Sequence, residues 1–242
     1  MTTPVLKIDS LTKKYGDFVA VDNLSLVIEP GEICAFIGHN GAGKTTTLKV
    51  SIGILEADSG DVMIDGISIK DNPLEAKRRT AYIPDNPDLY EFMTGIKYLN
   101  FIADVFGVGT EERNERINAL ASRLGLLDAL ATKISAYSHG MKQKLAIISA
   151  FLHSPKLIMM DEPFVGLDPV ASHVLKEMMR DHCAAGGSIF FSTHVLDVAE
   201  KLCDRVAIIK GGRLVVTGSM DEVRGDESLE SVFLDLEEGG NA

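Results

Sequence analysis

Short apolar runs alternate with amphipathic stretches along this chain, which is the pattern of an α/β domain. The runs ICAFIG, LIMMDE, SIFFST and RVAIIK are centred on unbroken apolar residues. Strands of a parallel sheet have this character, because both of their faces are buried. VLKID, LSLVIE and DVMIDG instead alternate apolar and polar residues, which favours an antiparallel layer with one face in water.

Helical periodicity is clearest at 43–53, 170–185 and 195–203. From about 94 to 154 there is no strand-like run, and glycines punctuate successive helical stretches. We therefore predict an α/β core with a mostly parallel sheet and an antiparallel β subdomain (about 1–33 and 61–85). A helical subdomain (about 92–154) is inserted into this core.

Composition is consistent with one large domain, since the 242 residues are 45% hydrophobic. No apolar run approaches the roughly 18 residues that span a bilayer, and the amino terminus lacks the pattern of a secretory signal. Cys34, Cys183 and Cys203 are scattered, which favours reduced thiols over a disulfide framework or a zinc site. We expect a cytoplasmic protein.

The net charge of −11 is unevenly distributed. Residues 219–242 hold eight acids against one base, and so carry −7 of it. We expect this segment to be a solvated, loosely ordered acidic tail. The nearly balanced remainder has no basic stripe of the kind that nucleic-acid binding requires, so we expect no nucleic-acid partner.

The segment GHNGAGKTT follows the run ICAFI and opens a helix, and it fits the phosphate-binding pattern Gly-x4-Gly-Lys-Thr. Gly41 and Gly43 let backbone N–H groups approach phosphate oxygens, and the helix start presents its positive dipole end. Lys44 can neutralise the β- and γ-phosphates, and the Thr45 hydroxyl can ligate Mg²⁺. A glycine turn that merely precedes a helix is the weaker alternative. We predict a P-loop NTPase core.

Two carboxylates follow the apolar run in LIMMDEP. Asp161 can hold Mg²⁺ through water, and Glu162 stands where a base for the attacking water is needed. Acids before a proline are also common at strand ends, but the phosphate loop makes that explanation less attractive. His194 ends the run SIFFSTH, where it either caps the strand or acts at the ligand-binding edge of the sheet.

A second helix start suited to an anion is YSHGMKQKL, residues 137–145. Ser138 stands in the capping position and Gly140 leaves the backbone accessible. Taken alone, this segment reads as an ordinary capped helix with a solvated basic face.

Together the motifs resemble the ATP-binding subunit of an ABC transporter, from Leu6 to about Gly218. GHNGAGKTT is similar to that family's Walker A loop, LIMMDE to its Walker B strand, VGLDP to its D-loop and YSHGMKQK to its signature, commonly LSGGQ. In this resemblance Tyr15 matches the aromatic residue that stacks on adenine, and His194 the switch histidine. We therefore expect one ABC-type ATP-binding domain over 1–218, followed by the acidic tail 219–242.

The resemblance assigns functional residues one by one. The implied ATP contacts are Tyr15, Gly38, Asn40, Gly41, Gly43, Lys44, Thr45 and Thr46 in one subunit, with Ser138 and Gly140 from a second subunit. The implied catalytic residues are Lys44, Glu162 and His194, and the implied Mg²⁺ ligands are Thr45, Asp161 and Asp85.

In that family two subunits pack head to tail, with each ATP between one phosphate loop and the other subunit's signature. The resemblance therefore implies hydrolysis of ATP with Mg²⁺, a second ATP-binding subunit, and separate membrane-spanning subunits that place the protein at the inner face of the cell membrane. The alternatives are a soluble ABC-type ATPase acting on DNA or ribosomes and an inactive regulatory ATP-binding module. Neither is favoured, because the chain has no long coiled-coil insertion or tandem cassette and retains Lys44, Asp161, Glu162 and His194.

Several positions depart from the family pattern. Tyr137 replaces the usual leucine of the signature, His139 its first glycine, and Met141 stands where glutamine is frequent. His39 stands in the phosphate loop where proline or serine is usual, and we expect its side chain to point outward and to matter little.

The Q-loop glutamine of the family falls at Asp85, in AYIPDNPDLY. Aspartate is shorter and charged, but it can reach Mg²⁺ through water. A proline-rich turn with capping acids is the alternative. The neighbouring apolar residues of LYEFM either face a membrane partner or pack inward.

Overall fold

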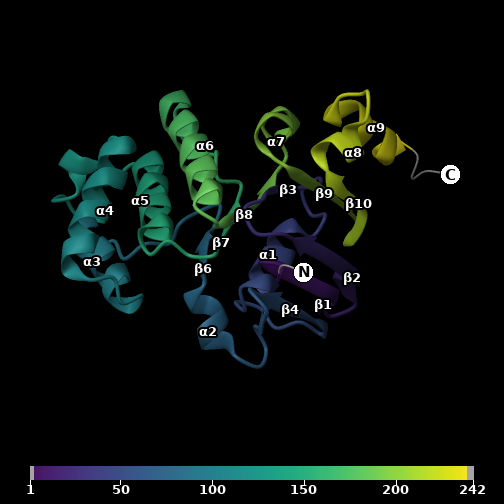
Figure 1. Cartoon of the computed structure of the whole chain (residues 1–242), viewed down its shortest axis with the longest axis horizontal. Helices are drawn as coiled ribbons and strands as arrows, with labels where there is room; N and C mark the ends of the chain where they lie inside the picture. Colours follow the sequence, from purple (N-terminus) through teal and green to yellow (C-terminus); the bar gives the residue numbers. More distant parts are fainter. Residues whose placement is uncertain (1–2, 239–242) are drawn as a thin grey trace.

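A sheet of six strands forms the centre of the computed structural model, which describes residues 3–238 (Figure 1). Its order is β10-β9-β3-β8-β7-β6. The parallel strands are β3 (Ile33–Ile37), β6 (Thr80–Ile83), β7 (Leu157–Asp161), β8 (Ser188–Thr193) and β9 (Arg205–Lys210), and β10 (Arg213–Ser219) joins the edge antiparallel. Every residue of β3, β7 and β8 is buried, which explains their unbroken apolar sequences.

Successive residues of these strands point into two separate hydrophobic cores, because side chains alternate across a sheet. In β3, Cys34 and Phe36 face the core shared with a second sheet, whereas Ala35 and Ile37 face the core covered by helices. The three cysteines are free, with Cys34 and Cys203 buried, as the sequence predicts.

The second sheet has four antiparallel strands among the described residues, in the order β2-β1-β4-β5. They are β1 (Leu6–Tyr15), β2 (Phe18–Ile28), β4 (Ser59–Ile64) and β5 (Ile67–Ser68). In β2 the side chains of Leu24, Leu26 and Ile28 are buried while the residues between them are exposed, which confirms the predicted wet face. The helix α1 (Lys44–Ser51) contributes Leu48 and Val50 to the core between the two sheets.

The assignment of TAYIP to the antiparallel layer was wrong. These residues form β6, which pairs in parallel with β7 and belongs to the central sheet. Four residues are too few to distinguish a half-exposed strand from a buried one, and here Thr80, Ala81 and Ile83 are all buried. A short helix, α2 (Pro73–Arg78), joins the second sheet to β6.

Helices fill the interval between β6 and β7 and cover one face of the central sheet. The interval holds α3 (Gly95–Val105), α4 (Thr110–Arg123) and α5 (His139–Leu152), which lie together at one end of the molecule (Figure 1). Two 3-10 turns, Leu127–Ala129 and Ile134–Ala136, connect them. The predicted helices at 170–185 and 195–203 are α6 (Pro169–Ala184) and α7 (Leu196–Leu202). Within residues 3–238 no helix combines the length and the apolar character needed to span a membrane.

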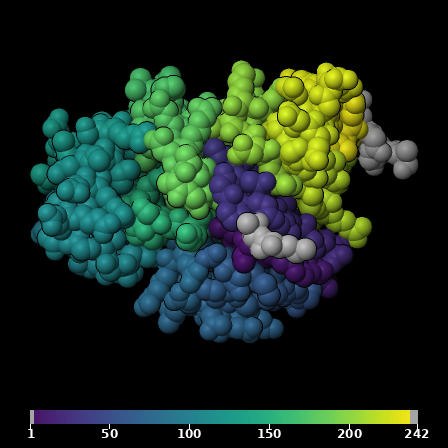
Figure 2. All heavy atoms as spheres, in the orientation of Figure 1, coloured from purple at the N-terminus to yellow at the C-terminus, as the bar shows by residue number. Residues whose placement is uncertain are grey.

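The acidic segment is ordered and packed, contrary to expectation. It forms α8 (Met220–Arg224) and α9 (Leu229–Glu238), which lie against the rest of the chain in Figure 2, while residues 239–242 lie outside the described part. Leu229 and Phe233 are buried in the core covered by helices, and Leu236 packs against it. Leu229, Phe233 and Leu236 are spaced four and three residues apart, so they share one face of a helix. The prediction considered only the net charge of the segment and missed this amphipathic pattern.

Candidate functional site

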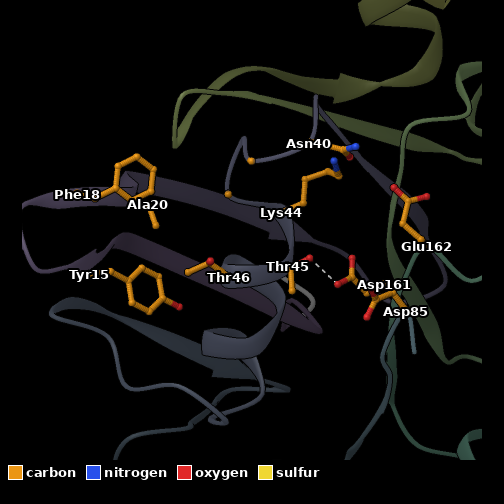
Figure 3. A pocket seen from close by; sticks show the side chains of 12 residues that line it. Tyr15, Phe18, Ala20, Asn40, Lys44, Thr45, Thr46, Asp85, Asp161 and Glu162 are labelled. Atoms are coloured by element: carbon orange, nitrogen blue, oxygen red, sulfur yellow. Dashed lines mark hydrogen bonds between the residues drawn. The ribbon is translucent and has the colours of Figure 1, made fainter. Parts of the chain in front are cut away.

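An open cavity lies where the carboxyl ends of β3 and β7 meet the start of α1 (Figure 3). It has a volume of about 320 Å³. Its lining comprises Tyr15, Phe18, Ala20, Asn40, Gly41, Gly43, Lys44, Thr45, Thr46, Asp85, Asp161 and Glu162. The fold thus collects most of the predicted site residues from distant segments of the chain.

Packing explains two glycines of the phosphate loop. A Cβ on Gly43 would lie 2.5 Å from the carbonyl oxygen of Ala20, and its φ of 111° also disfavours any other residue. A Cβ on Gly38 would lie 2.5 Å from the carbonyl oxygen of Ile209. Gly38 therefore does not line the cavity but fixes the loop against β9 from behind.

Lys44 lies inside the loop rather than in water. Its side chain is buried, and Nζ donates hydrogen bonds to the carbonyl oxygens of Gly38 (2.6 Å) and His39 (3.1 Å). Burial lowers the pKa of Lys44, although the nearby carboxylates of Glu162 and Asp161 oppose that shift. The loop therefore holds a cation at its centre, where a phosphate group can meet it.

Asp161 receives hydrogen bonds on both carboxylate oxygens. Thr45 Oγ1 donates to one oxygen at 2.6 Å and Ser192 Oγ donates to the other. Hydroxyl and carboxylate oxygens are the hard donors that Mg²⁺ prefers, so this pair fits the ion. Among residues 3–238 no group of three or more His, Cys, Asp and Glu side chains forms a metal site by itself. A site completed by substrate phosphates is consistent with that arrangement.

Glu162 has a left-handed backbone conformation, with φ of 47°. Such a conformation is uncommon outside glycine and asparagine and marks a constrained position. Its N–H group is held by the carbonyl oxygen and Oγ of Ser192, at 3.2 and 3.1 Å. Its carboxylate accepts a hydrogen bond from His194, whose Nδ1 lies 2.9 Å from Oε1. His194 therefore contacts a residue of the cavity lining without lining the cavity itself.

Sequence reasoning missed Ser192, Phe18 and Ala20. Ser192 stands directly beside Asp161 in the register of β7 and β8, which only the strand order reveals. Phe18 pairs with Tyr15 across the hairpin of β1 and β2, and both rings border the cavity while remaining largely exposed. The hairpin turn YGDF was the available signal, because it places the two aromatic residues opposite each other.

Residues 21–165 match the sequence profile of the family described as ABC transporter. The chain belongs to this family. It is 38% identical over 212 residues to an uncharacterized ABC transporter ATP-binding protein of Nostoc, covering 87% of this chain and 63% of that relative. It is 34% identical over 237 residues to the ABC-type transporter ATP-binding protein EcsA of Bacillus subtilis, covering 96% of each. The chain thus spans nearly the whole length of EcsA but about three fifths of the Nostoc relative.

Solved structures of ABC proteins share the fold. The chain superimposes on the ATP-binding subunit of an ABC transporter with a TM-score of 0.93 and 37% identity, covering 96% of this chain and 99% of that one. CbiO1 from Clostridium perfringens, part of the ABC transporter complex cbiONQ, gives a TM-score of 0.79 and 26% identity over 98% of both chains. These similarities confirm the predicted P-loop NTPase fold.

The segment that resembles the ABC signature lies outside this cavity. Ser138 caps α5, accepting a hydrogen bond from the N–H group of Met141 at 3.3 Å. A Cβ on Gly140 would lie 2.8 Å from the carbonyl oxygen of Gly166, so this glycine also allows the D-loop to pack against the helix start. The His139 ring occupies the space that a side chain at Gly166 would need. The structure therefore separates the two helix starts that suit an anion.

Asp85, in the Q-loop position, lines the cavity, and its Oδ1 accepts a hydrogen bond from the N–H group of Asn86 at 2.9 Å. The adjacent apolar residues differ in their burial. Leu89 is buried, whereas Tyr90 and Phe92 are 48% and 74% exposed.

The side chain of His39 points outward, as expected. It is largely exposed, but it does not extend freely into water, because it lies against Phe233 and Glu237 of α9. The segment that provides these contacts had been expected to be loosely ordered.

Proposed function

We propose that this chain is an ATPase subunit that powers an ABC transporter. One observation carries the proposal: a single cavity brings together Lys44, Thr45, Asp161 and Glu162, the cation, hydroxyl and carboxylates that phosphoryl transfer to water requires. Residues 1–218 act as one ATP-binding domain, and residues 219–242 follow it as an acidic segment.

Nucleotide binding uses both ends of the cavity. Tyr15 and Phe18 offer exposed ring faces to adenine, and Lys44 with the N–H groups of the loop receives the phosphates. Thr45 and Asp161 would hold Mg²⁺, and Asp85 would reach it through water. The bound ion would neutralise charge on the β- and γ-phosphates. The remaining predicted contacts, from Gly38, Asn40, Gly41, Gly43 and Thr46, belong to the same loop and helix start.

Hydrolysis requires a base beside the γ-phosphate. Glu162 accepts the proton of the attacking water, and His194 fixes the orientation of its carboxylate through the 2.9 Å contact. The left-handed backbone at Glu162 contributes to this orientation, because Ser192 holds the adjacent N–H group. Lys44 stabilises charge on the phosphates during transfer.

A second copy of this chain, or a homologous ATP-binding subunit, completes the site. Ser138 and Gly140 begin a helix whose positive dipole end suits a γ-phosphate, yet they do not line the cavity of their own chain. A head-to-tail dimer would place them opposite the partner's phosphate loop. ATP binding then closes the dimer and hydrolysis reopens it.

Separate membrane-spanning subunits would receive this motion, with the chain on the inner face of the cell membrane. The exposed rings of Tyr90 and Phe92 lie in the segment just after Asp85. An apolar surface of the partner would contact them there and respond to changes at the nucleotide site. The similar protein CbiO1 is part of a transporter complex, which supports partner subunits for this chain.

The replacement Glu162→Gln tests the ATPase proposal. We expect steady-state hydrolysis to fall by about 10²–10⁴-fold, since the amide cannot accept the proton, while ATP affinity stays near that of the wild type. An ATP-bound dimer should accumulate in size-exclusion chromatography. Glu115→Gln, at an exposed position on α4, is the matched control and should remain fully active. Near-normal turnover in the Glu162 variant would exclude Glu162 as the base, and a wild type without any hydrolysis would overturn the proposal.

A further inference from the structure

His39 connects the phosphate loop to the C-terminal helix α9. The centroid of its imidazole ring lies 5.1 Å from that of Phe233, and its Nε2 lies 3.4 Å from Oε2 of Glu237. When the imidazole is protonated, the second contact is an ion pair. The acidic segment thus reaches the loop that holds the nucleotide phosphates.

The end of α9 is fixed in place beside the loop. Leu229 and Phe233 anchor the helix in the core covered by helices, and the Leu229 N–H group donates to Glu200 Oε2 at 3.0 Å. At the other end, Lys210 Nζ donates to the carbonyl oxygens of Leu236 and Glu237, both at 3.0 Å. A lysine in this position stabilises the last turn of a helix. Lys210 Nζ also lies 3.7 Å from Oε2 of Glu237, so the carboxylate lies between Lys210 and His39.

The same loop residue also positions the phosphate-binding lysine. The carbonyl oxygen of His39 accepts hydrogen bonds from Lys44 Nζ and from the N–H group of Ala42, both at 3.1 Å. Behind the loop, a cavity of about 190 Å³ is bordered by the loop, by β9 and by Glu237. The side-chain contacts of His39 join the loop to α9 beside this cavity.

We propose that His39, Phe233 and Glu237 are positioning residues for nucleotide binding, through which docked α9 holds the phosphate loop in the form that accepts a triphosphate. The proposal rests on the loop's role in the proposed function. Docking of α9 and binding of ATP must then strengthen each other, because a coupling between two equilibria is reciprocal. Displacement of α9 from the loop would weaken nucleotide binding.

The test compares two charge-neutralising variants on the same helix of the full-length chain. Glu237→Gln keeps the shape of the side chain and removes the charge that faces both His39 and Lys210, while the Lys210 bonds to the helix carbonyls stay available. Asp235→Asn removes an exposed charge in the same helix. We expect Glu237→Gln to weaken the affinity for MgATP by about two- to fivefold, the range of a partly exposed ion pair. KM should rise with kcat nearly unchanged, and Asp235→Asn should bind like the wild type. Equal affinities in the two variants would overturn the proposal.

A double-mutant cycle and hydrogen exchange give independent readouts. His39→Gln should weaken binding to a similar degree, and the double variant should lose no more than the more impaired single variant. Addition of MgATP should slow amide exchange in α9 of the wild type, but not of Glu237→Gln. Fully additive effects in the cycle, or unchanged exchange in the wild type, would overturn the proposal.

Lys44→Ala separates this inference from the proposed function. If the wild type binds MgATP and Lys44→Ala does not, the loop is the nucleotide site, and failure of the α9 variants to differ from wild type refutes only the role of α9. A wild type that fails to bind MgATP would refute both.

Discussion

Asp85 contributes a carboxylate to the cavity at a position where the ABC family commonly has glutamine. The residue is exposed, and its Oδ1 accepts a hydrogen bond from the N–H group of Asn86. Asp85 lines the cavity with Asp161, while Asp88 of the same loop does not. A charged group beside the proposed magnesium site should change how the ion is held.

At this residue we predict that Asp85→Ala raises the Mg²⁺ concentration needed for half-maximal hydrolysis and lowers the coupling of hydrolysis to transport. ATP affinity should change little, because Tyr15 and the phosphate loop are untouched. Titration of hydrolysis with Mg²⁺, and transport by the reconstituted complex, measure both effects. Asp88→Ala is the matched control. If the two variants respond alike in both assays, Asp85 is only a turn residue.

At the scale of elements, the partly buried His182 lies between the end of α6 and the start of β8. A Cβ on Gly187 would lie 2.2 Å from Nε2 of His182, and the Phe151 ring packs edge-on at 5.6 Å. Burial, with a smaller contribution from His153, lowers the pKa of His182 to about 4. Its buried Nε2 has no hydrogen-bond partner within residues 3–238. The fold therefore favours the neutral imidazole.

The burial of His182 should make the free energy of unfolding depend on pH. The unfolded chain binds a proton at His182 near pH 6.5, whereas the folded chain does so only near pH 4, so the free energy of unfolding is highest above pH 6.5 and falls as the pH drops toward 4. The loss is at most about 3 kcal/mol. Urea unfolding at several pH values should show a shallower decline for His182→Gln, which has no such proton to bind. Parallel curves for the two proteins would contradict this account.

At the scale of the whole molecule, two helix starts suited to anions lie on different parts of one chain. The phosphate loop opens α1 beside the cavity, whereas Ser138 opens α5 outside it. A ligand that uses both must lie between two chains. The head-to-tail dimer proposed here follows from that separation rather than from any contact within the monomer.

The dimer predicts that Ser138→Arg lowers hydrolysis at least about tenfold while the isolated monomer keeps its ATP affinity. The bulky cation would occupy the place of the partner's γ-phosphate, and loss of the helix cap should cost only about 1 kcal/mol of stability. Ser135→Arg, an exposed position three residues earlier, is the control. Hydrolysis rates and equilibrium binding at low protein concentration give the two quantities.

A mixture of two variant proteins tests the dimer further. When Ser138→Arg protein is mixed with Lys44→Ala protein, part of the activity should return. In a dimer with one chain of each kind, one composite site has an intact phosphate loop and an intact signature. An equal loss of monomer affinity in Ser138→Arg would instead show that the signature contacts nucleotide within its own chain.

The sequence by itself determined the phosphate loop, the helix cap at Ser138 and the burial of the central strands. Each of these depends on neighbouring residues: a glycine-rich turn with its lysine, a serine before a helix, or a run of apolar side chains. Such local features can be recognised without knowing which residues pack against them. The ABC motifs could be recognised in the sequence for this reason.

Tertiary structure alone decided which distant segments meet. Ser192 supports Asp161 and Glu162 because β7 and β8 are neighbours, and TAYIP joins the central sheet because its partner is β7. The acidic segment folds onto the core, and Glu237 reaches His39, because apolar residues spaced along α9 find a surface to cover. These contacts form between segments that are far apart in the chain. Their contribution to the free energy of folding therefore cannot be predicted from any short stretch of sequence.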